Sequence, residues 1–129
     1  MTQDVRHLPR AALIDSYGNG GFRFGEMSHR GSILCLPNGV WASRVTTPAE
    51  IDELALALVF ESAGGGANAV NHFLVGTGMD PAILPAALRQ KFRDSKIAVE
   101  VMTTGAAVRT YNILLGENRP VGALLIAVG

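Results

Sequence analysis

The sequence has little of what usually identifies a function directly. It has a single cysteine, Cys35, which excludes an intrachain disulfide and suits a reducing compartment. Eleven basic residues balance eleven acidic ones, so no broad field attracts nucleic acid or an anionic membrane. The longest apolar runs, Leu54–Phe60 and Val121–Val128, are far shorter than the roughly 20 residues that span a bilayer. We therefore expect no nucleic-acid partner and no membrane span.

A targeting signal is also missing from the first residues. Asp4, Arg6, His7 and Arg10 interrupt the segment in which a signal peptide has an unbroken apolar stretch. The same segment does not have the pattern of a mitochondrial transit peptide. We therefore expect a cytoplasmic protein of bacterial type, without a signal or transit peptide.

Catalytic and metal-binding patterns are scarce. The histidines His7, His29 and His72 are scattered and show no metal-ligand spacing among themselves or with Cys35. Cys35 lies between leucines, which predicts a buried and inert thiol. The strings G-x-G-x-x-G and GK[ST], which mark dinucleotide and phosphate-binding loops, are absent. We expect no metal and no cofactor, and an enzyme is the less favoured class.

What the sequence has is the composition of a folded domain. Its 129 residues are 48% hydrophobic and 17% charged, which is enough apolar material for a buried core. This length suits one domain, and we expect a flexible arm over residues 1–10 and a single α/β domain over 11–129. Turn residues at Tyr17–Gly21 and Pro37–Gly39 separate short β segments. The first 45 residues therefore predict a small antiparallel unit of hairpins.

A helix start follows this unit. Thr47 can cap a helix, Pro48 fits its first position, and Glu50 can complete a capping box. Apolar residues then recur at helical spacing and predict one buried face, made of Ile51, Leu54, Ala55 and Leu58. A connector rich in glycine and alanine, Ser62–Asn68, comes next.

The second half alternates strands and helices. This alternation predicts an α/β fold with a mixed central sheet that contains a parallel strip, with helices packed on it. The expected fold also includes the N-terminal antiparallel unit, whose place relative to this sheet the sequence leaves open. Gly116 is expected to end the last helix in the left-handed conformation. The expected elements are a strand over Ala69–Val75, a helix over Pro85–Asp94, a strand over Ile97–Met102, a helix capped by Thr103 or Thr104, and a strand over Val121–Val128.

Two turns are candidates for a binding site. Ligands of open parallel sheets bind beyond the carboxyl ends of the strands, where Gly76-Thr77-Gly78 and Thr103-Thr104-Gly105 fall. If their strands are neighbours, glycine N–H groups, threonine hydroxyls and a helix N-terminus could hold an anion there. The alternative is that both are tight turns and helix caps. Asp80 is either a lone acid or, as Asp-Pro, a turn former.

The helix after the second turn predicts a mixed outer face. The residues that share an arc facing the sheet are Ala107, Val108, Tyr111, Leu114 and Leu115. Arg109 lies opposite this arc, with Asn112, Gly105 and Ile113 beside it. An arginine next to an exposed isoleucine is typical of a protein interface. The alternatives are a solvated arginine or an ion pair with Glu100, and a catalytic role is the least favoured.

Three stretches together resemble a known family. They are Ile14–Phe24 (IDSYGNGGFRF), His72–Gly78 (HFLVGTG) and Val99–Leu115 (VEVMTTGAAVRTYNILL). From about Leu13 to Val128 the chain is similar to a family of small single-domain proteins of largely unknown function, the Mth-type conserved hypothetical domain. That family includes the mitochondrial complex I assembly factor three.

The resemblance implies a compact α/β fold with a mixed central sheet and no established catalytic site. It also implies protein contacts, because the complex I member is a chaperone-like assembly factor. In the family Asp is usual at the position of Thr103 and Cys is common at the position of Val108. Chemistry that needs that acid or that thiol is therefore not implied for this chain.

The favoured function is a non-enzymatic protein-interaction or assembly-factor-like domain. Its surface would be the edge formed by Thr103–Gly105 and the outer helix face of Arg109, Asn112 and Ile113. The resemblance suggests respiratory-complex assembly components as partners, and a homo-oligomer stays open. The alternative is a small anionic-ligand-binding protein, or a weak enzyme, at Gly76–Gly78 and Thr103–Gly105.

Overall fold

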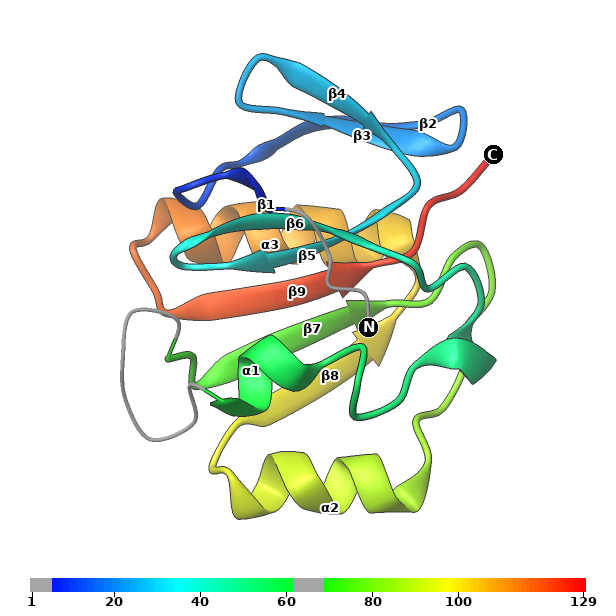
Figure 1. Ribbon diagram of the computed structural model, residues 1–129, viewed down its shortest axis with the longest axis vertical. Coiled ribbons are helices and arrows are strands. Elements are labelled where there is room, and N and C mark those ends of the chain that lie inside the picture. Colours follow the sequence, from blue (N-terminus) through cyan, green and yellow to red (C-terminus); the bar gives the residue numbers. More distant parts are fainter. Residues whose placement is uncertain (1–5, 62–68) are drawn as a thin grey trace.

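The computed structural model describes residues 6–61 and 69–129, which form two sheets and the helices that pack on them (Figure 1). The strands are β1 (Arg6–Leu8), β2 (Ile14–Gly18), β3 (Gly21–Phe24), β4 (Met27–Arg30), β5 (Ser32–Leu36), β6 (Gly39–Ser43), β7 (His72–Gly76), β8 (Ala98–Met102) and β9 (Val121–Leu125). The helices are a 3-10 turn η1 (Pro48–Glu50), α1 (Ala57–Glu61), α2 (Ala86–Asp94) and α3 (Thr104–Gly116).

The larger sheet has six strands in the order β1-β6-β5-β9-β7-β8. β7 runs parallel to both β8 and β9, whereas β5 pairs antiparallel with β9 and with β6. The second sheet is the antiparallel meander β2-β3-β4, which forms the upper end of the molecule in Figure 1. The expected mixed α/β fold with a parallel strip is confirmed.

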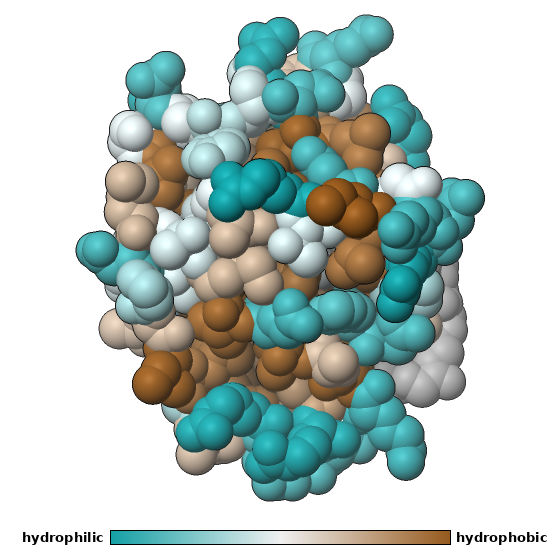
Figure 2. Space-filling view, turned by 180° about the vertical axis from the view of Figure 1, so that it is seen from behind, coloured by the Kyte–Doolittle hydropathy of each residue, from teal (hydrophilic) through white to brown (hydrophobic). Residues whose placement is uncertain are grey.

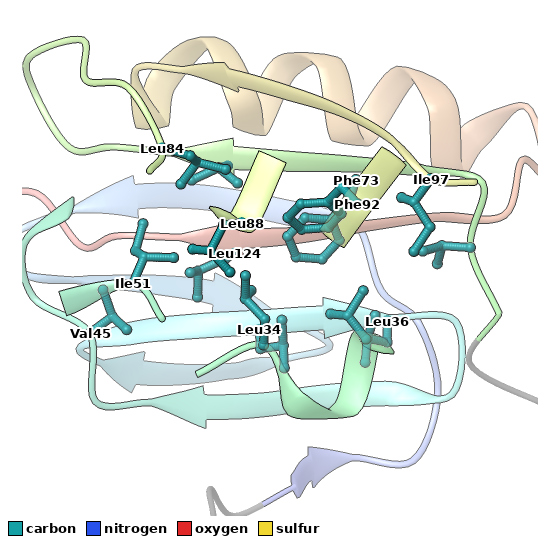
Figure 3. Packing of buried hydrophobic residues seen from close by; sticks show 14 of the residues in the cluster. Leu34, Leu36, Val45, Ile51, Phe73, Leu84, Leu88, Phe92, Ile97 and Leu124 are labelled. Carbon is teal, nitrogen blue, oxygen red and sulfur yellow. The ribbon is translucent and has the colours of Figure 1, made fainter. Parts of the chain in front are cut away.

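The larger sheet is buried on both faces. On the face of α1 and α2, Phe73 of β7 stacks on Phe92 of α2 with ring centroids 5.5 Å apart (Figure 3). Leu34 and Leu124, from β5 and β9, point into the same cluster. The alternate residues of these strands point to the other face, where α3 and the small sheet cover them. One hydrophobic cluster therefore packs on each face of the larger sheet.

The N-terminal half departs from the expected arrangement in one respect. β5 and β6 leave the hairpin unit and join the larger sheet, because β5 is buried along its whole length and pairs with β9. β1 lies within the segment expected to be a flexible arm, and it pairs with β6. Residues 1–5 of that arm and the connector Ser62–Asn68 lie outside the described residues.

The long helix expected after Thr47 is wrong. The Glu50 carboxylate accepts hydrogen bonds from the Thr46 and Thr47 amides, at 2.7 Å and 3.1 Å, and the turn ends at an extended Ile51. Helix α1 begins later, at Ala57. The helical spacing of Ile51, Leu54, Ala55 and Leu58 therefore does not mark one buried helix face. Leu54, for example, is 59% exposed.

Helices α2 and α3 lie close to their expected ranges. Leu88 and Phe92 of α2 are buried and face the larger sheet. The prediction that Gly116 ends α3 in the left-handed conformation is wrong. Gly116 stays within the helix, and the left-handed residue is Asn118, with φ 61°. Asparagine tolerates that conformation better than other residues with a side chain.

Candidate functional site

The two turns expected to form a binding edge lie side by side. Gly76 ends β7 and pairs with Met102, which ends the parallel neighbour β8. Thr77–Gly78 and Thr103–Gly105 therefore follow the same edge of the sheet. The strands are neighbours, as the sequence interpretation required.

Hydrogen bonds join these two turns to each other. The Gly78 amide donates to the Thr104 hydroxyl, and the Thr104 amide donates to the Gly78 carbonyl, both at 2.9 Å. The Thr104 hydroxyl donates in turn to the Ile126 carbonyl at 2.7 Å. Gly78 and Thr104 are buried. These groups have their hydrogen bonds within the protein, which favours turns and caps over an anion site.

Thr77 is also used structurally. Its amide donates to the Met102 carbonyl at 2.8 Å, and its hydroxyl donates to the Asp80 carbonyl at 2.7 Å. Asp80 itself is exposed, and its backbone shapes the turn. This geometry agrees with Asp80 as a turn former.

Little space separates the start of α3 from the end of β7. A Cβ added at Gly76 would lie 2.9 Å from the Thr104 Cα and 3.2 Å from the Ala107 Cβ. Glycine at this position lets the helix approach the strand closely. A ligand at this edge would therefore bind outside the turns rather than between them.

The outer face of α3 presents two of the predicted residues to solvent. Arg109 is exposed, and Ile113, one turn later, is 61% exposed. Within the described residues Arg109 has no ion pair. The alternative partner, Glu100, instead lies 3.4 Å from the His72 imidazole. A free guanidinium thus lies near an exposed apolar side chain.

Two other predicted residues of this surface contact the small sheet. The Asn112 side chain accepts from the Ile14 amide at 2.8 Å and donates to the Ile14 carbonyl at 2.9 Å. A Cβ added at Gly105 would come within 2.5 Å of the Tyr17 hydroxyl. The Asn112 side chain therefore joins β2 to α3, and glycine at position 105 leaves room for the Tyr17 hydroxyl beside the helix.

Figure 2 shows the face on which α3 lies, opposite to that of Figure 1. Apolar side chains gather there in patches between polar ones, whereas the lower end, near α2, is hydrophilic. A mixed surface of this kind differs from an evenly solvated helix face. Tyr17, which is 41% exposed beside Gly105, adds an aromatic ring that the sequence reasoning did not include.

Cys35 is fully buried, as predicted. Burial raises the pKa of its thiol to about 12. Burial also raises the pKa of the Tyr111 hydroxyl, and Cys35 contributes to that rise. A thiol in this state is protonated at neutral pH and is a poor nucleophile.

Other classes of site have no support in the part of the chain that the structure describes. No group of three or more His, Cys, Asp or Glu residues in residues 6–61 and 69–129 is placed to hold a metal ion. Within the same residues no helix combines the length and the apolar character needed to cross a membrane.

Comparison with known proteins identifies the family. Residues 14–126 match the family described as Protein of unknown function (DUF498/DUF598). The chain belongs to this family. The three stretches that carry the resemblance all lie within the matched residues, so the resemblance is confirmed.

Proteins similar to this chain occur in bacteria and in mammals. An uncharacterised protein of Rhodobacter capsulatus is 35% identical over 116 residues, which are 90% of this chain and 85% of that protein. The human NADH dehydrogenase (ubiquinone) 1 alpha subcomplex assembly factor 3 is 32% identical over 121 residues. That match covers 94% of this chain and 64% of the assembly factor, so the chain spans less than two thirds of that relative.

A solved structure agrees with the fold of this family member. The crystal structure of an outer membrane protein from Bartonella henselae superimposes with a TM-score of 0.88 at 45% identity. The match covers 95% of this chain and 100% of that one. The family is thus of unknown function and is related to an assembly factor.

Proposed function

We propose that this family member is a non-enzymatic protein-interaction domain of the assembly-factor type. Its partner surface, called here the α3 surface, consists of the exposed Arg109 and Ile113 with the partly exposed Thr103, Gly105 and Asn112 beside them. The observation that carries the proposal is the exposure of Arg109 and Ile113 one turn apart on α3. Arginine and apolar side chains together are typical of the centres of interfaces.

The two exposed side chains call for a partner of mixed chemistry. Covering Ile113 removes apolar surface from water, and full burial of such a side chain is worth about 1.5–3 kcal/mol. Arg109 offers a free guanidinium fork that matches a carboxylate. The partner would therefore present an acidic side chain beside an apolar one.

The partner class rests on the relatives. The human relative is named as an assembly factor of NADH dehydrogenase, which supports components of a respiratory complex as partners. A second copy of this chain is the other candidate. Size-exclusion chromatography with light scattering separates the two, since self-association depends on the concentration of the pure protein.

Affinity capture from the native lysate tests the α3 surface. We expect a protein that is held by the wild type and lost from Arg109→Glu, because the reversed charge repels the partner's carboxylate. Ile113→Asp should lose the same protein. Capture that is equal for Arg109→Glu and the wild type would overturn this assignment.

The matched control is Arg93→Glu, which reverses an exposed arginine on α2. It changes the net charge equally and should keep the partner. Circular dichroism melting of each variant shows whether the fold is intact. A partner lost equally from Arg93→Glu would point to nonspecific charge attraction.

The alternative function is a small anionic ligand at Gly76–Gly78 and Thr103–Gly105. It is the weaker proposal, because the Gly78 amide and the Thr104 hydroxyl already have partners. Thermal shift against phosphates, nucleotides and carboxylates tests it. A ligand at 100 times its dissociation constant should stabilise the protein by about 2.7 kcal/mol.

A further inference from the structure

The small sheet carries a depression that the α3 surface does not include. It has a volume of about 410 Å³ and draws on all three strands of the sheet. Most of its lining residues, Ser16 and Arg23 among them, belong to Ile14–Phe24, the first stretch that carries the family resemblance. The others include Ser28 and Arg30 of β4. Most of this stretch lies outside the α3 surface.

Strand register places the polar residues of the depression on one face. Ser16 pairs with Arg23, and Arg23 pairs with Ser28, so their side chains project to the same side of the sheet. Arg30 lies two residues after Ser28 and shares that side. All four residues are exposed. The opposite face, with the buried Phe22, packs into the core.

Positive charge in this depression is not balanced. Arg23 and Arg30 line it, and no carboxylate does. An Arg23 guanidinium nitrogen donates to the Ser28 hydroxyl at 3.0 Å, which leaves most of its N–H groups free. In the part of the chain that the structure describes, neither arginine has an ion pair. The whole chain is neutral, so this excess is local.

Space is left between these groups. A Cβ added at Gly18 would meet no atom within 4 Å, whereas one added at Gly20 would lie 3.6 Å from an Arg30 guanidinium nitrogen. Arg30 therefore lies over the β2–β3 turn, on the same side as Arg23. Two guanidinium groups flank an open, polar hollow.

We propose that this depression binds a small anion through Arg23 and Arg30, with phosphate or carboxylate oxygens as the recognised groups. Guanidinium groups bind both kinds of oxygen through paired N–H donors. An anion between the two arginines also relieves the repulsion between like charges. The hydroxyls of Ser16 and Ser28 supply further donors. Unlike the two turns at the strand ends, this site keeps its donors free.

The exposure of the site predicts its behaviour. Interactions between exposed charges are screened by salt, with a Debye length of about 8 Å at physiological ionic strength. Binding should therefore weaken as sodium chloride is added. An anion with two charged groups should bind more tightly than a monovalent one, because it reaches both arginines.

Nuclear magnetic resonance of the ¹⁵N-labelled protein tests the site. The probes are inorganic phosphate, pyrophosphate and succinate, each titrated to about 10 mM at constant ionic strength. We expect saturable shifts confined to the amides of β2, β3 and β4. Tighter binding of pyrophosphate than of succinate would identify phosphate oxygens as the recognised groups. The reverse order would identify carboxylate oxygens.

Matched variants show whether binding depends on Arg23 and Arg30. Arg23→Gln and Arg30→Gln should each weaken binding by about tenfold, and the double variant should abolish the shifts. The control double variant Arg44→Gln with Arg93→Gln removes the same charge at two exposed arginines outside the depression and should bind as the wild type does. Arg109 is unchanged in all of these variants, so failure of this site and failure of the α3 surface are distinguishable.

Two results would overturn the inference. One is the absence of saturable shifts for all three probes. The other is an equal loss of binding in both double variants, which would show a response to net charge alone. A spectrum of each variant with the dispersion of the wild type establishes that the small sheet is still folded.

Discussion

A single hydroxyl joins three segments at the edge of the sheet. Thr104 is fully buried at the start of α3, and its hydroxyl accepts from Gly78 after β7 and donates to Ile126 after β9. Both partners are backbone groups of buried residues, which need a hydrogen bond inside the protein. The strand ends and the helix are therefore held in place by one side chain.

Valine at position 104 would keep the shape of the side chain and remove this hydroxyl. Each buried group that it leaves unpaired costs about 1–3 kcal/mol. We expect Thr104→Val to lower the free energy of unfolding by about 2–5 kcal/mol, measured by urea denaturation. Thr104→Ser keeps the hydroxyl and should lose about 1 kcal/mol. A valine variant as stable as the serine variant would contradict this account.

The sequence predicts the position of Thr104 but not its partners. Helix-start patterns place Thr103 or Thr104 at the beginning of α3, as observed. The bond to Ile126 joins residues 22 positions apart, and it exists only because β9 lies beside β7. Periodicity within a helix carries no information about such a neighbour. For the same reason the sequence does not predict the bonds of Asn112 to Ile14.

At the scale of elements, α3 connects the two sheets. Ala107 and Tyr111 face the larger sheet and are fully buried, whereas Asn112 holds the Ile14 backbone of the small sheet by two hydrogen bonds. The larger sheet is joined to the helix mainly by apolar packing. The small sheet packs on the helix through Ile14, Phe22 and Phe24 of the same cluster, and the two bonds of Asn112 add to this packing.

Asn112→Ala should loosen the small sheet selectively. Loss of both hydrogen bonds to Ile14 should cost about 1–3 kcal/mol. Native-state hydrogen exchange should show faster exchange of the amides of β2 to β4 and little change in β7. Asn112→Asp keeps an acceptor for the Ile14 amide and should lie between wild type and alanine. Equal loss of protection in both sheets would count against a selective role.

A second contact to the small sheet involves two histidines. His29 of β4 and His7 of β1 have ring centroids 4.5 Å apart. Burial, and then the neighbouring His7, hold the pKa of His29 below its ordinary value of about 6.5. The unfolded chain thus binds a proton more readily than the native protein.

Stability should therefore fall as the pH falls below about 6.5, and the fall should end below the native pKa of His29. We expect His29→Gln to make the loss of unfolding free energy between pH 7.5 and pH 5 smaller, with both values taken at roughly constant salt. Urea denaturation at each pH measures it. An unchanged pH dependence in His29→Gln would remove this histidine from the explanation.

The sequence predicts local elements of this chain better than their assembly. Strands and helices after residue 69 alternate as expected, because each has its own periodicity and turn signals. β5 was placed with the hairpins before it, since only its pairing with β9 shows that it belongs to the larger sheet. In α1 the error is local, because Glu50 and Asp52 each cap a separate short turn.

At the scale of the whole molecule, the larger sheet lies between two packed layers and is inaccessible to solvent at its centre. Both faces are covered, by the clusters around Phe73 and around Tyr111. Cys35 lies within this sheet, on β5, with strands on both sides. A reagent can reach its sulfur only after the packed layers separate.

Thiol labelling measures that separation. Because burial raises the pKa of Cys35 to about 12, the thiolate needed for reaction is scarce even before access is considered. We expect an aromatic disulfide reagent to react only through global opening, so the free energy of opening should equal that of urea unfolding. Cys35→Ala with Ala49→Cys moves the thiol to an exposed position and should react at once. Labelling of wild type with a much smaller opening energy would instead show that β5 separates from β9 while the rest of the molecule stays folded.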